Sequence, residues 1–276
     1  MIQVQDVYVN RGARRVLRQL NCCIGPGKVT TVMGRNGAGK TTLLEAMTGR
    51  LPIVEGRIVW DDMLLQRISP VEMAGRRAVL SQQLQLNFPL RVEELVEMGT
   101  YSRHRDLSRY QRSVIIDEVM VRLDLEQFIG RYFHQLSGGE RQRVLLAKCL
   151  AQLNCSRHLY SHQYLFLDEP TNSLDIEQQY YLLAQVRQLA REQQIGILAI
   201  LHDINLAAQC SDEILLLKEG TIRYRGSPER VLTEKSLKDI FNINTTIGRH
   251  PVTDGPLITI LPYEVCNRTE TTIGGT

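Results

Sequence analysis

The sequence predicts an α/β fold: a mostly parallel sheet with helices, interrupted by a mostly helical subdomain. Short apolar stretches typical of strands alternate with helical patterns near both ends of the chain, as in parallel-sheet proteins. From about residue 92 to residue 153 the helical period dominates. The length of 276 residues allows one large domain or two small ones with a sizeable core.

The strands are predicted from runs rich in β-branched and apolar residues, taken in chain order. The first-half strands are expected at 2–9 (IQVQDVYV), 29–34 (VTTVMG), 56–62 (GRIVWDD) and 77–82 (RAVLSQ). In the second half, 163–170 (QYLFLDEP) and 195–203 (IGILAILHD) indicate buried strands. Residues 213–226 indicate a hairpin that turns at Glu219-Gly220.

Apolar residues at helical spacing predict the helices. They are expected at 41–51, 92–99, 113–125, 140–153 and 177–193. We expect residues 1–262 to form a single domain, with the helical subdomain at about 84–153 inside it. The polar stretch 263–276 is expected to be a disordered tail.

Composition excludes several functional classes. Hydrophobic residues make up 43% and charged residues 23%, and 33 Lys and Arg against 30 Asp and Glu give a net charge of only +3. This balance does not indicate nucleic-acid binding, which needs a basic patch. No apolar run reaches the roughly 18–20 residues that span a bilayer, and the N-terminus MIQVQDVYVNRG does not resemble a secretory signal.

The six cysteines contain no C-x-x-C pair, so we expect free thiols in a reducing cytosol. One local group leaves an alternative open. Cys155, His158 and His162 in NCSRHLYSHQ are spaced as metal ligands can be, although a fourth ligand is not evident. The simpler interpretation is a polar loop.

A phosphate-binding loop is predicted at 34–41, where GRNGAGKT matches G-x-x-x-x-G-K-[ST]. The required context, a strand before it and a helix after it, is present. Lys40 is expected to reach the β- and γ-phosphates, and Thr41 to bind Mg²⁺. The alternative is a simple glycine turn. The predicted nucleotide-binding residues are Gly34, Arg35, Asn36, Gly37, Ala38, Gly39, Lys40, Thr41 and Thr42.

Acidic residues at the end of the strand LFLDEP complete this site. Asp168 is expected to hold Mg²⁺ through water, and Glu169 to orient or deprotonate the attacking water. His202 follows a buried strand and could hydrogen-bond the γ-phosphate, although a lone histidine there is more often structural. Gln82 could reach Mg²⁺ and the water, or merely face solvent.

A second glycine-containing segment, LSGGERQR at 136–143, opens a predicted helix near Glu140. Backbone N–H groups at a helix start favour an anion. The chain therefore carries two candidate phosphate sites about 100 residues apart.

As an ordered set, these motifs resemble the ATP-binding subunit of an ABC (ATP-binding cassette) transporter over about residues 1–262. The resemblance implies a P-loop NTPase (RecA-like) core with an antiparallel β subdomain and an inserted helical subdomain, with ATP and Mg²⁺ as cofactors. It also implies that two copies pair head to tail as a homodimer. The signature residues Leu136, Ser137, Gly138, Gly139 and Glu140 would then close on the partner's ATP, and the loop Ser173, Leu174 and Asp175 would contact the other copy.

The resemblance assigns Gln82 to the glutamine loop and His202 to the switch histidine. Many family members have an aromatic residue that stacks on adenine before the first loop. The equivalent place here is near Arg11 in NRGARR, whose planar guanidinium can also stack.

Two stretches, 88–104 and 201–220, resemble the bacterial type II importers of metal chelates. Within that group, RRAVLSQ (76–82), the extended loop after LAKCLAQL and RHPVTDGPLITILP (249–262) are most similar to the hemin importers. The resemblance implies peripheral attachment at the cytoplasmic face of the inner membrane. The expected partners are two membrane-spanning permease subunits and, indirectly, a periplasmic substrate-binding protein, with no nucleic acid. A ferric-siderophore or cobalamin importer, or a soluble non-transport ABC ATPase, remains the alternative. A non-hydrolysing cassette would be expected to lack Glu169 or His202.

Overall fold

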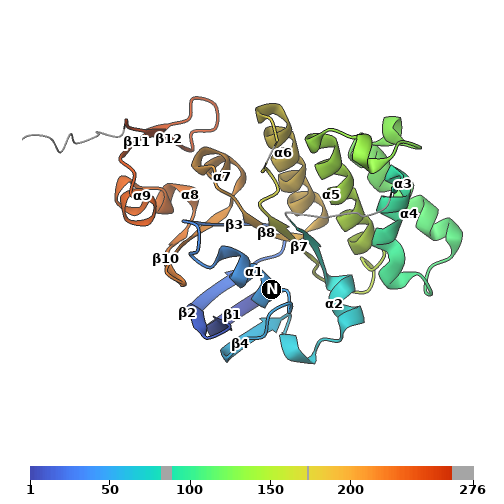
Figure 1. Ribbon diagram of the computed structural model, residues 1–276, viewed down its shortest axis with the longest axis horizontal. Coiled ribbons are helices and arrows are strands. Elements are labelled where there is room, and N and C mark those ends of the chain that lie inside the picture. The colour runs from blue at the N-terminus through green and yellow to red at the C-terminus, as the bar shows by residue number, and fades with distance from the viewer. Residues whose placement is uncertain (82–88, 173, 263–276) are drawn as a thin grey trace, which may run out of the picture.

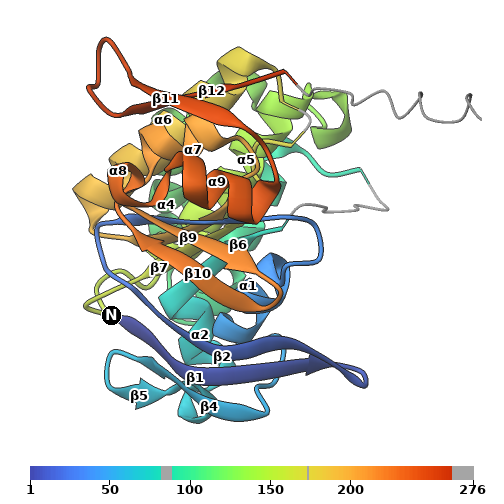
Figure 2. The same ribbon diagram turned by 90° about the vertical axis from the view of Figure 1, so that its left-hand side faces the viewer.

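The computed structural model describes residues 1–81, 89–172 and 174–262. Two residues with predicted functions, Gln82 and Ser173, lie outside these ranges. The α/β fold class is confirmed. Figure 2 shows three layers: an antiparallel sheet, a central sheet, and helices α5, α6 and α7 over the central sheet's other face.

The central sheet has the strand order β10-β9-β3-β8-β7-β6. The pairs β9–β3, β3–β8, β8–β7 and β7–β6 are parallel, and β10 is antiparallel to β9. The bounds are β3 Val29–Gly34, β6 Arg77–Leu80, β7 Tyr164–Asp168, β8 Gly196–Ile200, β9 Glu213–Lys218 and β10 Thr221–Gly226. The hairpin predicted at 213–226 is confirmed, with Glu219 and Gly220 at positive φ in its turn.

The antiparallel sheet has the order β2-β1-β4-β5. Its strands are β1 Ile2–Arg11, β2 Arg14–Ile24, β4 Glu55–Trp60 and β5 Met63–Leu64. Strand β2 was missed from the sequence because three arginines and several register shifts against β1 obscure its alternation. The first residues of β2 line the cavity beside the phosphate loop.

Helices pack against both faces of the central sheet. Helix α1 (Lys40–Met47) lies with β1, β2 and β4 in one apolar core, which also receives Phe166 and Leu198. The other core receives the alternate residues Leu165 and Leu167 and contains α5 (Gly138–Asn154), α6 (Ile176–Gln193) and α7 (Ile204–Cys210). The central strands are thus buried on both faces, which explains their continuous apolar runs.

The central part of the chain contains α2 (Pro70–Arg76), α3 (Val92–Glu97), a 3₁₀ turn at Met98–Arg103, α4 (Arg109–Arg122) and then α5. Figure 1 shows these helices gathered on one side of the molecule. Two short 3₁₀ turns, Glu126–Phe128 and Phe133–Gln135, separate α4 from α5.

The C-terminal part contains α8 (Pro228–Val231), α9 (Glu234–Phe241) and the hairpin β11 (Thr245–Arg249) with β12 (Pro256–Ile260). The hairpin is fixed to α7 because the Asn205 side chain bonds both the N–H and the C=O of Ile258, at 2.9 and 3.0 Å. Helices α2, α7, α8 and α9 and this hairpin were not predicted from the sequence, because each of these elements is short.

Within the described ranges, no helix is both long enough and apolar enough to cross a bilayer. Cys22, Cys23, Cys149, Cys155 and Cys210 are free thiols, as expected. Burial raises the pKa of Cys22 to about 12 and the pKa values of Cys149, Cys155 and Cys210 to about 11.

These four thiols should therefore resist alkylation of the native protein at pH 8, because the thiolate is the reactive form. Cys23 is only half-buried and should label first among the described cysteines. Mass spectrometry of iodoacetamide-treated protein checks this, with denatured protein as the control in which every cysteine labels. Labelling of Cys149 as fast as Cys23 would contradict the packing around α5.

Candidate nucleotide-binding and catalytic site

The site forms where three parallel strands end at one edge of the central sheet. The loop 34–39 begins at the last residue of β3, Asp168 ends β7 with Glu169 directly after it, and His202 follows β8. Because neighbouring parallel strands deliver their carboxyl ends to the same edge, residues more than 100 positions apart meet there. The sequence identified each group, and the sheet order brings them together.

The phosphate loop can be formed only by glycine at certain positions. Gly39 has φ +106, and a Cβ atom there would lie 2.7 Å from Leu17 Cδ2. Gly34 has φ +155, and a Cβ atom there would overlap the carbonyl oxygen of Leu217. Gly39 also precedes α1 without a capping side chain. The first N–H groups of α1 have no intrahelical acceptor, which makes this helix start suited to an anion.

Lys40 lies folded onto this loop with only 6% of its surface exposed. Its Nζ donates to the carbonyl oxygens of Gly34, at 2.9 Å, and Arg35, at 3.3 Å. Burial lowers the pKa of Lys40, and the nearby charges of Glu169 and Asp168 partly oppose this effect. The arrangement places a cation against the concave side of the loop.

Thr41 and Asp168 face each other across the site. The Thr41 hydroxyl donates to Asp168 Oδ1 at 3.4 Å. Burial raises the pKa of Asp168, and the negative charge of Glu169 raises it further. A hydroxyl and a carboxylate, both oxygen donors, fit the preference of Mg²⁺ for hard ligands and few protein contacts.

Glu169 occupies a strained position directly after β7. Its φ of +52° is rare for a residue with a side chain, and such strain is concentrated at functional sites. Its Oε1 lies 2.6 Å from His202 Nε2, and its Oε2 accepts a hydrogen bond from Asn172 Nδ2. The structure thus joins Glu169 and His202 directly, which the sequence alone did not show.

The signature segment begins α5, and here the expected boundary is wrong. The helix starts at Gly138 rather than near Glu140, so both glycines belong to its first turn. Ser137 is the N-cap: its side chain accepts from Glu140 N, and Glu140 Oε2 accepts from Ser137 N at 2.7 Å. This capping box forms because Ser and Glu stand three residues apart. It lowers the pKa of Glu140.

Leu136 is buried, whereas Ser137 and Gly138 are exposed. Gly139 faces α6, where an added Cβ would lie 2.6 Å from the Gln178 side chain. The signature therefore presents one small, polar surface to solvent. A larger residue at position 139 would collide with a neighbouring helix.

The other predicted positions lie as follows. Leu174 packs against the core, and Asp175 caps α6 by accepting from Gln178 N at 2.8 Å. Arg11 Nε donates to Thr42 Oγ1 at 3.1 Å, and its guanidinium also pairs with Glu45. Arg11 therefore lies beside α1, held by an acidic residue that the sequence analysis did not consider.

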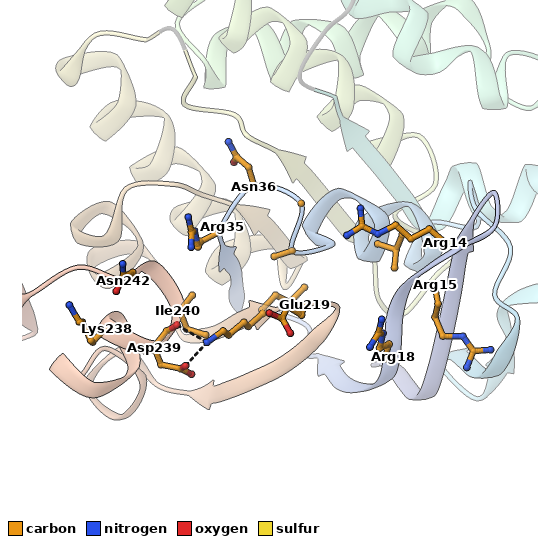
Figure 3. A pocket seen from close by; sticks show the side chains of 15 residues that line it. Arg14, Arg15, Arg18, Arg35, Asn36, Glu219, Lys238, Asp239, Ile240 and Asn242 are labelled. Carbon is orange, nitrogen blue, oxygen red and sulfur yellow. Dashed lines mark hydrogen bonds and ion pairs between the residues drawn. The ribbon is translucent and has the colours of Figure 1, made fainter.

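A cavity of about 960 Å³ adjoins the phosphate loop. Figure 3 shows Arg35 and Asn36 of the loop on one side and Arg14, Arg15 and Arg18 of β2 on the other, with Glu219 between them. Val16 also lines the cavity, and Lys238 and Asn242 of the α9 region close one end. Arg14, Val16 and Glu219 were not predicted from the sequence as residues of this site. The dense arginines in RGARRVLR were the available signal.

Cys155, His158 and His162 do not surround a common point. Cys155 is buried at the end of α5, His158 is exposed, and His162 Nδ1 lies 3.1 Å from Asp61 Oδ1. Among the residues that the structure describes, no group of three His, Cys, Asp or Glu is placed to hold a metal ion.

A family model for ABC transporters matches residues 17–172 of the chain. The chain belongs to the ABC transporter family. The resemblance seen in the motifs is thereby confirmed: this cassette is an ATP-binding subunit in a family that couples ATP hydrolysis to transport.

Two curated relatives match the cassette over almost its whole length. Hemin import ATP-binding protein HmuV of Hahella chejuensis is 38% identical over 94% of this chain and 100% of its own. The protein of the same name from Rhizobium meliloti is 35% identical over 94% of this chain and 97% of its own. The fold matches a metal-chelate type ABC transporter in an inward-facing conformation, with a TM-score of 0.80, 23% identity and coverage of 95% and 97%.

Proposed function

We propose that this cassette hydrolyses ATP to drive hemin uptake through a separate membrane-spanning permease. The assignment of hemin as the substrate rests on the match to hemin import ATP-binding proteins over essentially their full length. Ferric siderophores and cobalamin are the competing substrates, because residues 88–104 and 201–220 resemble type II metal-chelate importers as a group.

The chemistry that we assign rests on the edge of the central sheet. We propose that residues 34–42 hold the ATP phosphates through backbone N–H groups, with Lys40 on the β- and γ-phosphates. Thr41 and Asp168 would hold Mg²⁺, which neutralises phosphate charge when bound. Glu169 would accept the proton of the attacking water, and His202 would orient Glu169 and contact the γ-phosphate. Gln82 keeps its proposed role at Mg²⁺, outside the described residues.

The base of ATP would enter the cavity between the phosphate loop and β2. Val16 offers an apolar surface there, and Arg14 a planar cation that can stack on a ring. Arg11 is committed to Glu45, so we assign it to the wall near Thr42 rather than to the base. This assignment moves the proposed adenine contact by a few residues along the same hairpin.

We further propose a homodimer in which the exposed Ser137 and Gly138 cover the partner's ATP, with Asp175 near the dimer contact. Residues 1–262 would act as one ATPase domain, with the helical subdomain at 84–153 receiving the permease. Such an assembly lies at the cytoplasmic face of a bacterial inner membrane. A periplasmic binding protein would deliver the substrate to the permease.

The substrate assignment is tested with the cassette and its co-purified permease in proteoliposomes. We expect ATP-dependent uptake of hemin, and little uptake of a ferric siderophore or cobalamin. Uptake of either competitor in preference to hemin would overturn the hemin assignment and leave the ATPase assignment standing.

Replacing Lys40 with Ala should weaken ATP binding and abolish hydrolysis together. Lys40 is the cation held against the phosphate loop, so its loss removes charge from both the bound and the reacting state. Calorimetric titration with ATP and a phosphate-release assay measure the two effects. Lys28→Ala, outside the loop, is the matched control. Unchanged affinity and turnover in Lys40→Ala would mean that the loop is a simple glycine turn with no role in phosphate binding.

Replacing Asp168 with Asn should abolish Mg²⁺-dependent hydrolysis and yet stabilise the nucleotide-free protein. Burial and Glu169 raise the pKa of Asp168, so its charge opposes folding increasingly as pH rises from its ordinary value through the raised one. The Tm of Asp168→Asn should therefore exceed that of the wild type at pH 8, with a smaller difference at pH 5. Thermal unfolding at pH 8 and pH 5 checks this. A lower Tm at pH 8 would contradict it.

A further inference from the structure

The carboxylate of Glu169 is held at both of its oxygens. Oε1 lies 2.6 Å from His202 Nε2, and Oε2 accepts from the Asn172 carboxamide. Asn172 reaches back because the chain turns here: its backbone N–H donates to the Glu169 carbonyl oxygen at 3.2 Å. The positive φ of Glu169 belongs to the same turn. The orientation of this carboxylate is therefore determined partly by a side chain three residues further along.

We propose that Asn172 is a positioning residue that orients Glu169 for attack by water. The inference rests on the proposed role of Glu169 as general base. A small misplacement of a reacting group lowers the reaction rate. A carboxylate that accepts a proton through one oxygen is therefore best oriented when its other oxygen is held by a hydrogen bond. The two anchors differ in chemistry. His202 meets the carboxylate with a ring nitrogen, whereas the carboxamide of Asn172 is a neutral N–H donor.

The contact has a function in turnover rather than in stability. Asn172 is exposed, and the turn at Glu169 is closed by backbone atoms that a substitution at position 172 leaves in place. Exposed hydrogen bonds to carboxylates contribute little to folding. Glu169, in contrast, has only 17% of its side chain exposed, so its orientation matters inside the site.

The test uses the full chain in a steady-state phosphate-release assay with ATP and Mg²⁺. Asn172→Ala should lower kcat by about 3- to 10-fold, the range for one net hydrogen bond, with KM and calorimetric Kd for ATP unchanged. Asn172→Asp has the same size but no N–H donor and adds a repelling charge, so its loss should be at least as large. Asn172→Ser keeps a shorter donor and should recover part of the rate.

A matched control exists on α6, where exposed Gln188 donates to Glu192 Oε1 at 2.7 Å. Gln188→Ala removes the same kind of amide–carboxylate bond away from the site and should leave kcat unchanged. If the kcat of Gln188→Ala falls as much as that of Asn172→Ala, the inference is overturned. So would a rise in KM with kcat unchanged, because that result would mean that Asn172 acts on ATP binding.

The Glu169→Gln background separates this inference from the proposed function. If Asn172 acts through Glu169, Asn172→Ala should cause no further loss there. A further loss of similar size would place the action of Asn172 elsewhere and overturn the inference alone. If Glu169→Gln itself hydrolyses ATP normally, the general-base assignment fails and this inference fails with it.

Discussion

Glu169→Gln should lower steady-state phosphate release by about 10²–10⁴-fold, the usual contribution of a general base, while ATP binding persists. The substitution keeps the size of the side chain and removes its ability to accept a proton. The structure makes this residue the strongest candidate, because it follows β7 in a strained conformation within 2.6 Å of His202. Phosphate release and ATP titration on the same preparation measure the two effects.

The matched control is Glu177→Gln, an exposed carboxylate in the first turn of α6, which should leave turnover unchanged. A rate for Glu169→Gln within about threefold of wild type would contradict a transition-state role of this size. A loss of ATP binding would instead indicate damage to the loop, since the negative charge of Glu169 raises the pKa of Lys40.

Ser137→Arg should prevent ATP-driven dimerisation and hydrolysis while the isolated subunit still binds ATP. Ser137 is exposed at the start of a 17-residue helix whose first-turn N–H groups and dipole favour an anion. In the proposed homodimer, an arginine side chain would fill the space that the partner's γ-phosphate would occupy. Size-exclusion chromatography with ATP, calorimetry and phosphate release measure the three properties.

The capping box requires a second variant, because arginine also removes the N-cap hydroxyl. Ser137→Ala removes the same hydroxyl without bulk and should cost about 1 kcal/mol of stability while still allowing dimerisation. Normal dimerisation and hydrolysis by Ser137→Arg would show that the signature does not cover a partner's nucleotide. Mixed with Lys40→Ala, Ser137→Arg should regain some activity if one intact composite site can turn over.

Local patterns in the sequence are sufficient to predict the fold class and most of the groups proposed for the chemistry. Strand, glycine loop and helix around GRNGAGKT follow from local rules, since each glycine permits a φ or a close approach that other residues cannot adopt. The apolar runs ending in LDE and before His202 predicted buried strands, because a strand covered on both faces has no polar alternation. Ser137 and Glu140 predicted a helix start, with an error of two residues.

Packing between elements that are distant in the chain determines which of these groups meet. His202 reaches Glu169 because β8 lies beside β7 in the sheet, and no local pattern encodes that neighbour relation. Asn172 binds Glu169 through a turn whose geometry depends on a positive φ. Arg14 and Val16 line the cavity because β2 runs past the phosphate loop, whereas Arg11 forms an ion pair with Glu45. Periodicity reports which face of an element is buried, whereas packing between distant elements determines which side chains come into contact.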